Sequence, residues 1–471
     1  MGKTYNILLA CFAATGSFLF GYDSGVMTDV IASPNFLNYF HTEDTSPIIG
    51  AINSTFSGGA VFGSLMGGLT MDRLGRRKTI QIGALVAAIG AILQCAAVDL
   101  AMILVGRIIS GWAMIGVGFI VSTWIGYGSL HAPDSNSVQW RFPLAFQALP
   151  SLVLLAGLFV LPESPRWLIE KDRNEDGLAV LQKLHGQEPE DWIMAEYNEI
   201  RATIAAERAV TVQSWSVMFK VPQWRLRLMH GTLVQVFTQL TGINVIGYYQ
   251  TIMYRALGIT GHRNTLVAGI YNVVGPITNF FFITFFLDRV GRRKPLLFGA
   301  AGITIALICE AVINSQNVDG TRHGLSIAGV FFLFLVSCIF SVSFGPISWV
   351  YMSEVMPMQI RGRGNAFATG IGNWLVSTLF AQVSPIALGK IGWKYYFVFC
   401  AFNIVVTIPT VFFVFKETNQ LSLEEIDLLF GERALGNLPE NLAEKDVDDV
   451  IRNASVGNGK AAGVSTHEDK V

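Results

Sequence analysis

The sequence predicts an all-α integral membrane protein built from two pseudo-repeated helical bundles. Of its 471 residues, 52% are apolar and only 14% are charged, whereas a soluble chain carries about 25% charged residues. Long apolar runs recur along the chain, and a spanning helix needs about 20 such residues. In addition, one seven-residue string occurs twice, beginning at Asp72 and again at Asp288. These observations favour lipid as the main solvent and a duplicated architecture.

The apolar runs predict about 11 spans instead of an even 12, five in the first half and six in the second. The expected spans are 7–30, 48–71, 79–98, 100–127, 142–161, 228–250, 264–287, 296–313, 325–349, 364–389 and 394–415. We therefore expect an incomplete N-terminal transmembrane bundle over 1–161 and a C-terminal bundle over 228–415. Between them, 162–227 reads as a cytoplasmic linker with amphipathic helices around 174–208, and 416–471 as a cytoplasmic tail with one short surface helix before a disordered end.

Charge and cysteine usage exclude several function classes. The formal net charge is -1, so nothing favours a nucleic-acid partner, which a basic domain or stripe would indicate. The five cysteines lie inside apolar runs without metal-ligand spacing, which disfavours a disulfide framework and a zinc site. No nucleophile–base pair or phosphate loop lies outside the spans. We expect no enzyme, no cofactor and no metal.

The repeated string is Asp-Arg-x-Gly-Arg-Arg-Lys, at 72–78 and 288–294. Each copy follows one long apolar run and precedes another, which predicts a tight loop at a membrane face. Four basic residues in so short a loop indicate the cytoplasmic side, and the glycine permits the turn. Two copies in the same order indicate duplicated halves, as in transporters with parallel repeats.

Further motifs make the chain resemble a known family. They are Gly-Tyr-Asp at 21–23, Gly-Arg at 106–107, Pro-Glu-Ser-Pro-Arg-Trp at 162–167, Gln-Leu-Thr-Gly-Ile-Asn at 239–244, Gly-Pro-Ile-Ser-Trp at 345–349 and Ser-Glu at 353–354. With the two loops, they resemble the sugar porters of the major facilitator superfamily, most closely fungal hexose and pentose transporters, over about residues 5–430. The resemblance implies the major facilitator fold and transmembrane transport of a monosaccharide by alternating access.

The first half is shorter than the second. Asp72 and Glu163 are closer in sequence than the matching Asp288 and Glu417, and 100–127 contains no charged loop like the one around Glu354. The family has six helices in each half. We therefore expect that the end of the fourth helix, its cytoplasmic loop and the start of the fifth are missing, as in a splice variant or a mistaken gene model. Five crossings would also place the linker and the second basic loop outside, against the positive-inside bias.

The resemblance assigns a proton-coupling pair. Asp23 lies in the first span and Arg107 in the fourth, and an ionisable group inside the membrane is functional by default. In proton-coupled members of the family the residues at these positions form a proton-controlled pair, which implies symport. A static ion pair that locks two helices is the structural alternative.

A neutral polyhydroxy ligand needs amides for hydrogen bonds and an aromatic face for its ring. The resemblance implies that the C-terminal half supplies such residues. The candidates are Gln239, Asn244, Tyr248, Asn272, Trp349, Asn373 and Trp374. For any one of them, interhelical hydrogen bonding or aromatic packing is an equally good explanation. Thr238 replaces the first of two adjacent glutamines usual in the family, and a glutamine of the fifth helix falls in the missing stretch.

A third group is expected to form cytoplasmic gating clusters. It comprises Asp72, Arg76, Arg77, Glu163, Arg166, Asp288, Arg292, Arg293, Glu354, Arg361 and Glu417. Individual exposed ion pairs are weak, so the argument rests on a network. The expected partners of the chain are a monosaccharide, a proton and the lipid bilayer, and the expected location is the plasma membrane. The alternatives are a facilitative carrier, a non-transporting sugar sensor and an inactive truncated isoform.

Overall fold

A computed structural model describes the chain from residue 12 to residue 431 with gaps. The described residues are 12, 15, 18–19, 21–112, 119–133, 136–159, 161–185, 189–210, 215–317, 321–421 and 423–431. Helices and loops make up this part, and it contains no strand. The all-α prediction is therefore confirmed. Much of the expected first span and nearly all of the tail beyond 431 lie outside the described residues.

The first half includes a helical segment at 21–30. Its helices are α2 (Pro34–Tyr39), α3 (Pro47–Leu74), α4 (Arg76–Cys95), α5 (Leu100–Trp112), α6 (Phe119–Ser129), α7 (Val138–Phe146) and α8 (Ala148–Gly157). The linker contains α9 (Pro165–Glu170), α10 (Asn174–Leu184), α11 (Glu190–Val210) and α12 (Val217–Lys220). Its apolar faces pack into a small core of their own around Leu181, Ile193 and Tyr197, as the amphipathic pattern predicts.

The second half follows the linker. Its helices are α13 (Pro222–Leu240), α14 (Ile243–Ala256), α15 (His262–Phe285), α16 (Leu287–Val290), α17 (Arg293–Gln316), α18 (His323–Ser341), α19 (Phe344–Val355), α20 (Arg361–Phe367), the π-helix η1 (Ala368–Leu375), α21 (Val376–Ile391), η2 (Gly392–Tyr395), α22 (Tyr396–Phe402), η3 (Asn403–Thr407), α23 (Ile408–Phe413) and α24 (Leu423–Leu429). The last is the short surface helix expected after residue 416.

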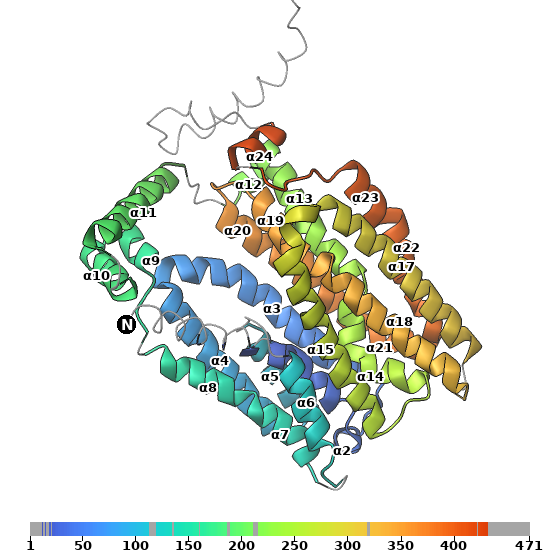
Figure 1. Ribbon diagram of the computed structural model, residues 1–471. Coiled ribbons are helices and arrows are strands. Elements are labelled where there is room, and N and C mark those ends of the chain that lie inside the picture. The colour runs from blue at the N-terminus through green and yellow to red at the C-terminus, as the bar shows by residue number, and fades with distance from the viewer. Residues whose placement is uncertain are drawn as a thin grey trace, which may run out of the picture.

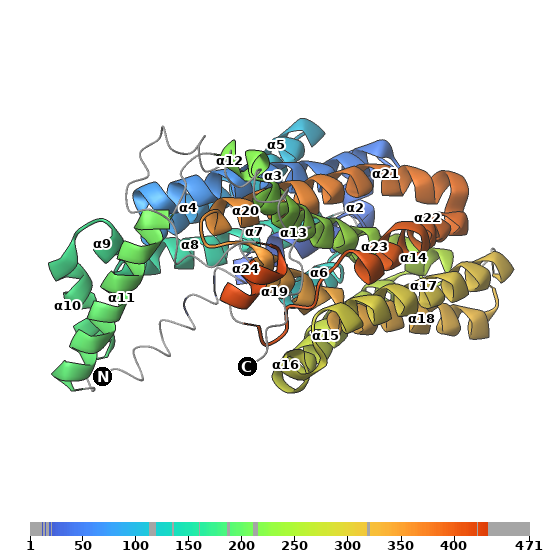
Figure 2. The ribbon, with the colours of Figure 1, turned by 90° about the horizontal axis from the view of Figure 1, so that it is seen from above.

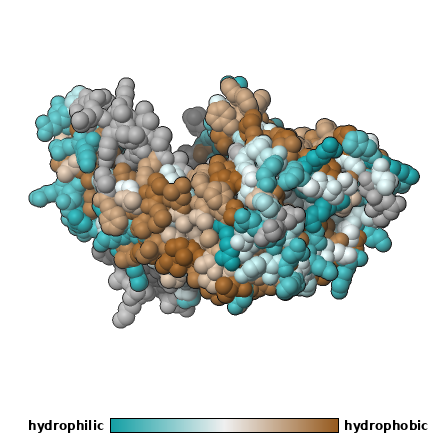
Figure 3. Space-filling model, turned by 90° about the horizontal axis from the view of Figure 1, so that it is seen from below, coloured by the Kyte–Doolittle hydropathy of each residue, from teal (hydrophilic) through white to brown (hydrophobic). Residues whose placement is uncertain are grey.

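Six helical stretches within the described residues are long and apolar enough to cross a membrane. They are Pro47–Gly67, Arg76–Cys95, His262–Phe285, Arg293–Gln316, His323–Val355 and Arg361–Phe413. Figure 3 shows a broad hydrophobic area in the middle of one face, with hydrophilic side chains gathered toward its ends. This distribution fits a molecule whose middle lies in the bilayer.

The two halves meet along α3, which packs against η1 and α21, and along α6, which packs against α15. They converge at the end that holds α2 and α14 and separate toward the end that holds α9 and α24 (Figure 1). Seen from above, α4 and α8 lie on the opposite side of the molecule from α17 and α18 (Figure 2). The linker helices project beyond the N-terminal half.

The expected single span at 100–127 is wrong. Within the described residues, α5 (Leu100–Trp112) and α6 (Phe119–Ser129) stand on either side of 113–118, and their outer ends lie at the same face of the molecule. A single span would place these ends at opposite faces. Apolar composition alone cannot distinguish the two paths, because both require hydrophobic helices.

Both ends of this helix pair lie at one face of the molecule. Arg141, at the start of α7, donates to the carbonyls of Cys95 and Ala97 just before α5, at 2.6 and 2.9 Å. Ser129, at the end of α6, donates to the carbonyl of Gln139 at 2.9 Å. The chain therefore enters and leaves on the same side, and the linker lies beside the first basic loop. The expected displacement of the linker and the second loop to the outside is corrected accordingly.

Candidate functional site

The candidate sugar-binding residues gather where the seventh family helix breaks. Gly242 has φ 81°, a left-handed conformation that glycine adopts without a Cβ penalty, and it separates α13 from α14. Gln239 ends up one turn before the break and Asn244 just after it. The sequence predicts that Gly242 loosens this helix, and the structure agrees.

Four amides form a continuous hydrogen-bonded cluster across three helices. Asn244 donates to Gln239 Oε1 at 2.7 Å, and Gln239 donates to Asn373 Oδ1 at 2.7 Å. Asn373 then donates to Gln235 Oε1 at 3.0 Å. We call Gln235, Gln239, Asn244 and Asn373 the amide cluster. Asn373 lies in η1, and π-helical turns are frequent at functional sites. Sequence reasoning missed Gln235, although its spacing of one turn before Gln239 could have indicated it.

The other candidates lie around this cluster in different ways. Asn272 donates to Thr123 at 2.7 Å and so joins α15 to α6 across the two halves. Tyr248 is buried, and its ring meets Tyr249 edge to face. Trp374 is buried and packs with Val61 of α3, at the contact between the halves. Trp349 is 44% exposed on α19 and, within the described residues, contributes no hydrogen bond to the amide cluster.

The hydroxyl of Thr238 is already used inside its own helix. It donates to the Val234 carbonyl at 2.9 Å, so the replacement of the family's first glutamine leaves a short, self-satisfied side chain beside the cluster. The amides of Gln235 and Gln239 are thus the polar groups that this helix offers to a ligand.

The side chain of Arg107 contacts the backbone carbonyl of Asp23 and not its carboxylate. The guanidinium of Arg107 is fully buried, donates to the Asp23 carbonyl at 2.7 Å and to the Ile52 carbonyl at 3.3 Å, and stacks over the Phe56 ring at 4.3 Å. Asp23 is 3% exposed, and its Oδ1 has no hydrogen-bond partner. No ion pair joins the two side chains among the described residues, so the predicted static lock is absent from this conformation.

Two further buried acids were not singled out from the sequence. Both carboxylate oxygens of Asp29 lack hydrogen-bond partners, and a Cβ on Gly126 would come within 2.4 Å of Asp29 Oδ2. Glu310 accepts from Asn314 at 2.7 Å through Oε1, while its Oε2 has no partner. A rule that flags every acid inside an apolar span would have found both.

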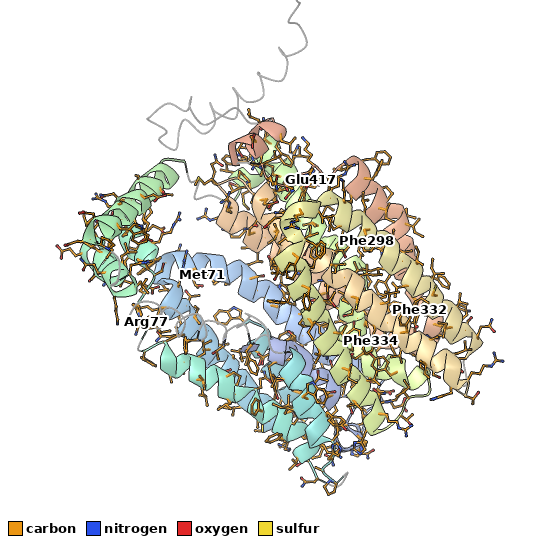
Figure 4. All side chains as sticks on the ribbon, in the orientation of Figure 1. Met71, Arg77, Phe298, Phe332, Phe334 and Glu417 are labelled. Atoms are coloured by element: carbon orange, nitrogen blue, oxygen red, sulfur yellow. The ribbon has the colours of Figure 1, made fainter. Side chains whose placement is uncertain are left out.

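The residues expected in the gating clusters make unequal contacts in the two halves. Glu163 accepts from the backbone N–H of Arg77 at 3.1 Å, and Glu417 accepts from the backbone N–H groups of Arg292 and Arg293 at 2.8 and 3.1 Å. Each carboxylate thereby binds a helix N-terminus, where anions are favoured. Figure 4 labels Arg77 beside the linker helices and Glu417 beside α24.

Arg292 also forms a buried ion pair. Its Nη2 lies 2.9 Å from Glu354 Oε1, and Thr418 donates to Glu354 Oε2 at 2.7 Å. Asp288 lies 3.9 Å from Arg292 but is 86% exposed. Arg293 binds the carbonyls of Val411 and Phe412 instead of an acid.

The remaining gating candidates are less tightly placed. Arg361 donates to the Met356 carbonyl at 3.3 Å. Arg166 follows Glu163 at the start of α9, and the side chain of Asp72 lies outside the described residues. Arg76 is exposed, and no acidic side chain pairs with it in the part of the chain that the structure describes. The expected network is therefore present around Arg292 and thinner around Arg76.

The outer ends of the two halves are joined directly. Arg255 of α14 pairs with Asp44, Thr28 donates to the Gly247 carbonyl at 3.2 Å, and Gln382 donates to the Pro47 carbonyl at 3.1 Å. Two helical bundles that are joined at one end, with a cluster of amides inside the second bundle, fit a membrane carrier of the major facilitator type.

Comparison with known proteins gives the family. A profile of the family described as "Sugar (and other) transporter" matches residues 9–114 and 112–430. The chain belongs to this family, as the sequence motifs predict, and it is therefore a multi-pass membrane transporter, not an enzyme. The match divides at 112–114, within the expected span 100–127.

Curated relatives cover nearly the whole chain. It is 34% identical to the MFS-type transporter criB of Aspergillus cristatus, over 91% of this chain and 94% of that protein. It is 32% identical to the hexose transporter HXT13 of Saccharomyces cerevisiae, over 90% and 83% of the two chains. A solved structure of the proton:xylose symporter XylE has a TM-score of 0.72 at 22% identity, covering 91% of this chain and 100% of that one. This structural likeness supports the fold alone.

Proposed function

We propose that the protein carries a monosaccharide, a hexose or a pentose, across the plasma membrane by alternating access. The amide cluster is the observation that carries this proposal. Its four side chains offer donors and acceptors to a neutral hydroxylated ligand, beside the helix break at Gly242 in the second half. The name of the yeast relative, a hexose transporter, supports the same substrate class. The bundles at 1–161 and 228–415, the linker 162–227 and the tail 416–471 are proposed as the domains of this carrier.

Uptake by the intact chain tests the proposal. Cells that lack their own hexose carriers would express it, and uptake of labelled glucose and xylose would follow confirmation of surface delivery. Saturable uptake is expected. Absence of uptake from a chain at the surface, together with absence of a sugar-induced thermal shift, would identify an inactive isoform. A thermal shift without uptake would instead identify a sensor.

Substitution of Gln239 tests the amide cluster. Gln239→Leu removes the hydrogen bonds of this side chain to Asn244 and Asn373 and those that it would form with the sugar. Loss of hydrogen bonds to the ligand costs about 1–3 kcal/mol, so the KM for sugar uptake should rise by roughly 5- to 150-fold. Asn403→Leu is the matched control, because Asn403 is a fully buried amide in η3 outside the cluster. An equal effect of both variants on KM would contradict the assignment.

We further propose that transport is coupled to protons through Asp23 and Arg107. A carboxylate that is neutral in one state and charged beside Arg107 in another biases the inward–outward equilibrium. Uptake should then increase at acidic external pH and collapse with a protonophore. Asp23→Asn should abolish this pH dependence while sugar exchange continues.

Asp29→Asn is the matched comparison for the proton pair. It makes the same charge change six residues further along the same helix, at a carboxylate without a hydrogen-bond partner. The proposal expects this variant to keep pH-dependent uptake. If Asp29→Asn rather than Asp23→Asn removes the dependence, the coupling residue is Asp29, and pH-independent uptake by the unmodified chain would identify a facilitator.

Absence of a segment after Trp112 is proposed as the reason that the first half is shorter in sequence than the second. Sequencing of the transcript across the codons for 113–118 decides between a splice variant and a genuine short gene. A longer transcript with an inserted segment would be expected to carry the fourth and fifth helices at full length. If every transcript lacks an insertion, the short form is the natural protein.

A further inference from the structure

The two repeated loops each end in a lysine that the gating clusters do not use. Lys78 and Lys294 occupy the same place in the string, one at the start of α4 and one at the start of α17. Each lines a surface hollow, of about 530 and 560 Å³ respectively. The walls of the two hollows differ in chemistry, and this difference points to different occupants.

The hollow at Lys78 is closed by the protein itself. Its wall includes Trp167 of α9 together with Arg173 and Asp176 of α10, and Glu163 contributes an acid. Linker helices therefore cover this face of α4, and the acids Glu163 and Asp176 offset part of the positive charge of the wall. Because the linker already occupies this side of α4, we assign no ligand to it.

The hollow at Lys294 is an apolar groove without such a cover. Its wall combines Phe281, Phe286, Val290, Phe298 and Val342 with Lys294, on α15, α16, α17 and the end of α18. The rings of Phe281, Phe286 and Phe298 are each more than half exposed. Apolar surface of this size is unfavourable in water, whereas a lipid chain covers it without cost.

The groove begins at the cytoplasmic face. Phe298 lies five residues after the start of α17, about 7.5 Å into the span, and Figure 4 shows it toward the Glu417 end of the C-terminal bundle, with Phe332 and Phe334 farther along. The basic loop 288–294 forms its rim. The groove thus has an apolar floor at the depth of the inner leaflet's acyl chains and cations at the depth of its headgroups.

Two cations of the loop 288–294 form no ion pair with the part of the chain that the structure describes. Lys294 and Arg289 are both exposed, and no ion pair of either is present among the described residues. The nearby acid, Asp288, is directed to Arg292 at 3.9 Å. The inner leaflet carries anionic lipids that attract such side chains with about 1 kcal/mol for each Lys or Arg near the surface.

We propose that this groove binds an anionic phospholipid of the cytoplasmic leaflet. One acyl chain lies along Phe281, Phe286 and Phe298, and the phosphate contacts Lys294, with Arg289 as the second cation. The lipid then bridges α15 and α17 around the loop whose other arginines hold Glu354 and Glu417. This proposal is independent of which substrate the protein carries.

Lipid binding to the purified full chain tests the proposal. Native mass spectrometry in detergent would compare phosphatidylserine and phosphatidylcholine with identical acyl chains. We expect stronger binding of the anionic lipid, weakened about fivefold by Lys294→Gln and restored by Lys294→Arg. Lys390→Gln is the control, since Lys390 lies in the last turn of α21 at the opposite end, and it should change nothing.

Other outcomes would overturn the proposal. Equal binding of the two lipids, or unchanged binding in Lys294→Gln, would exclude an anionic headgroup site at this lysine. A thermal shift caused by inorganic phosphate alone, as large as that caused by the lipid, would identify a simple anion site. Phe298→Glu provides an independent variant, because an acid in the apolar floor should weaken binding of the anionic lipid while Lys294 remains.

Discussion

The loops 72–78 and 288–294 share one sequence pattern, yet they hold their arginines differently. In both, a glycine with φ near 90° allows a glutamate from the end of the same half to approach a helix N-terminus. Only the second loop buries the arginine that follows its glycine: Arg292 is 7% exposed and pairs with Glu354, whereas the corresponding Arg76 is exposed. The acid that completes the second cluster, Glu354, lies in the last turn of α19. The same motif therefore gives a glutamate cap in both halves, whereas the ion pair with Glu354 belongs to the second half.

The largest effect that separates the two loops should come from Glu354→Gln. It leaves Arg292 buried without its counter-charge, which costs 3–5 kcal/mol for a fully buried pair. Because Glu354 is 24% exposed, we expect about 2–3 kcal/mol. Thermal unfolding of the purified chain measures the loss. An unchanged melting temperature would show that the ion pair adds nothing to the second half.

The loop glycines should give the next effect, and it should be similar in the two halves. Gly75 has φ 90° and ψ 164°, and Gly291 has φ 84° and ψ -171°, a region nearly restricted to glycine that costs other residues about 1–3 kcal/mol. Gly75→Ala and Gly291→Ala should therefore destabilise by comparable amounts. A large difference in their melting temperatures would break the proposed equivalence of the turns.

Removal of the capping carboxylates should have a smaller effect. Glu163→Ala and Glu417→Ala each leave helix N-terminal N–H groups without an acceptor, at about 1–2 kcal/mol. Thermal unfolding should show near-equal losses, and the double variant should show their sum, because the sites lie in different halves. A marked departure from additivity would reveal coupling between the halves at this face.

Arg76→Gln should have the smallest effect and serves as the counterpart of Glu354→Gln. Exposed substitutions without a partner usually stay within about 0.5 kcal/mol. Arg292→Gln, at the same place in the second string, should cost clearly more, since it strands Glu354. If both arginine variants destabilise equally, Arg76 has a partner in the intact membrane protein that this conformation does not bring to it.

Most of the helical layout could be predicted from the sequence. The spans at 48–71, 79–98, 264–287 and 296–313 correspond to α3, α4, α15 and α17, because hydrophobic runs bounded by charged loops leave few alternatives. The break at Gly242 and the amphipathic linker were also predictable. In each case a local signal determines the outcome.

The sequence did not predict the path of the chain through 100–129 or which side chains contact one another. Apolar composition does not record where a chain turns back, so α5 and α6 looked like one span. Motif identity places Arg107 near Asp23, but not that its guanidinium meets the carbonyl instead of the carboxylate. Nor does it show that Gln235 completes the amide cluster while Trp349 stands exposed. Such contacts depend on helix rotation and on the relative position of the two halves.

The return of the chain between Leu100 and Ser129 has a consequence for how such a chain enters a membrane. Each later segment inherits its orientation from whether the number of crossings before it is odd or even. A segment that enters and leaves at the same face contributes an even number of crossings, so it does not invert the segments that follow. The loops 72–78 and 288–294, both rich in basic residues, can therefore face the same compartment.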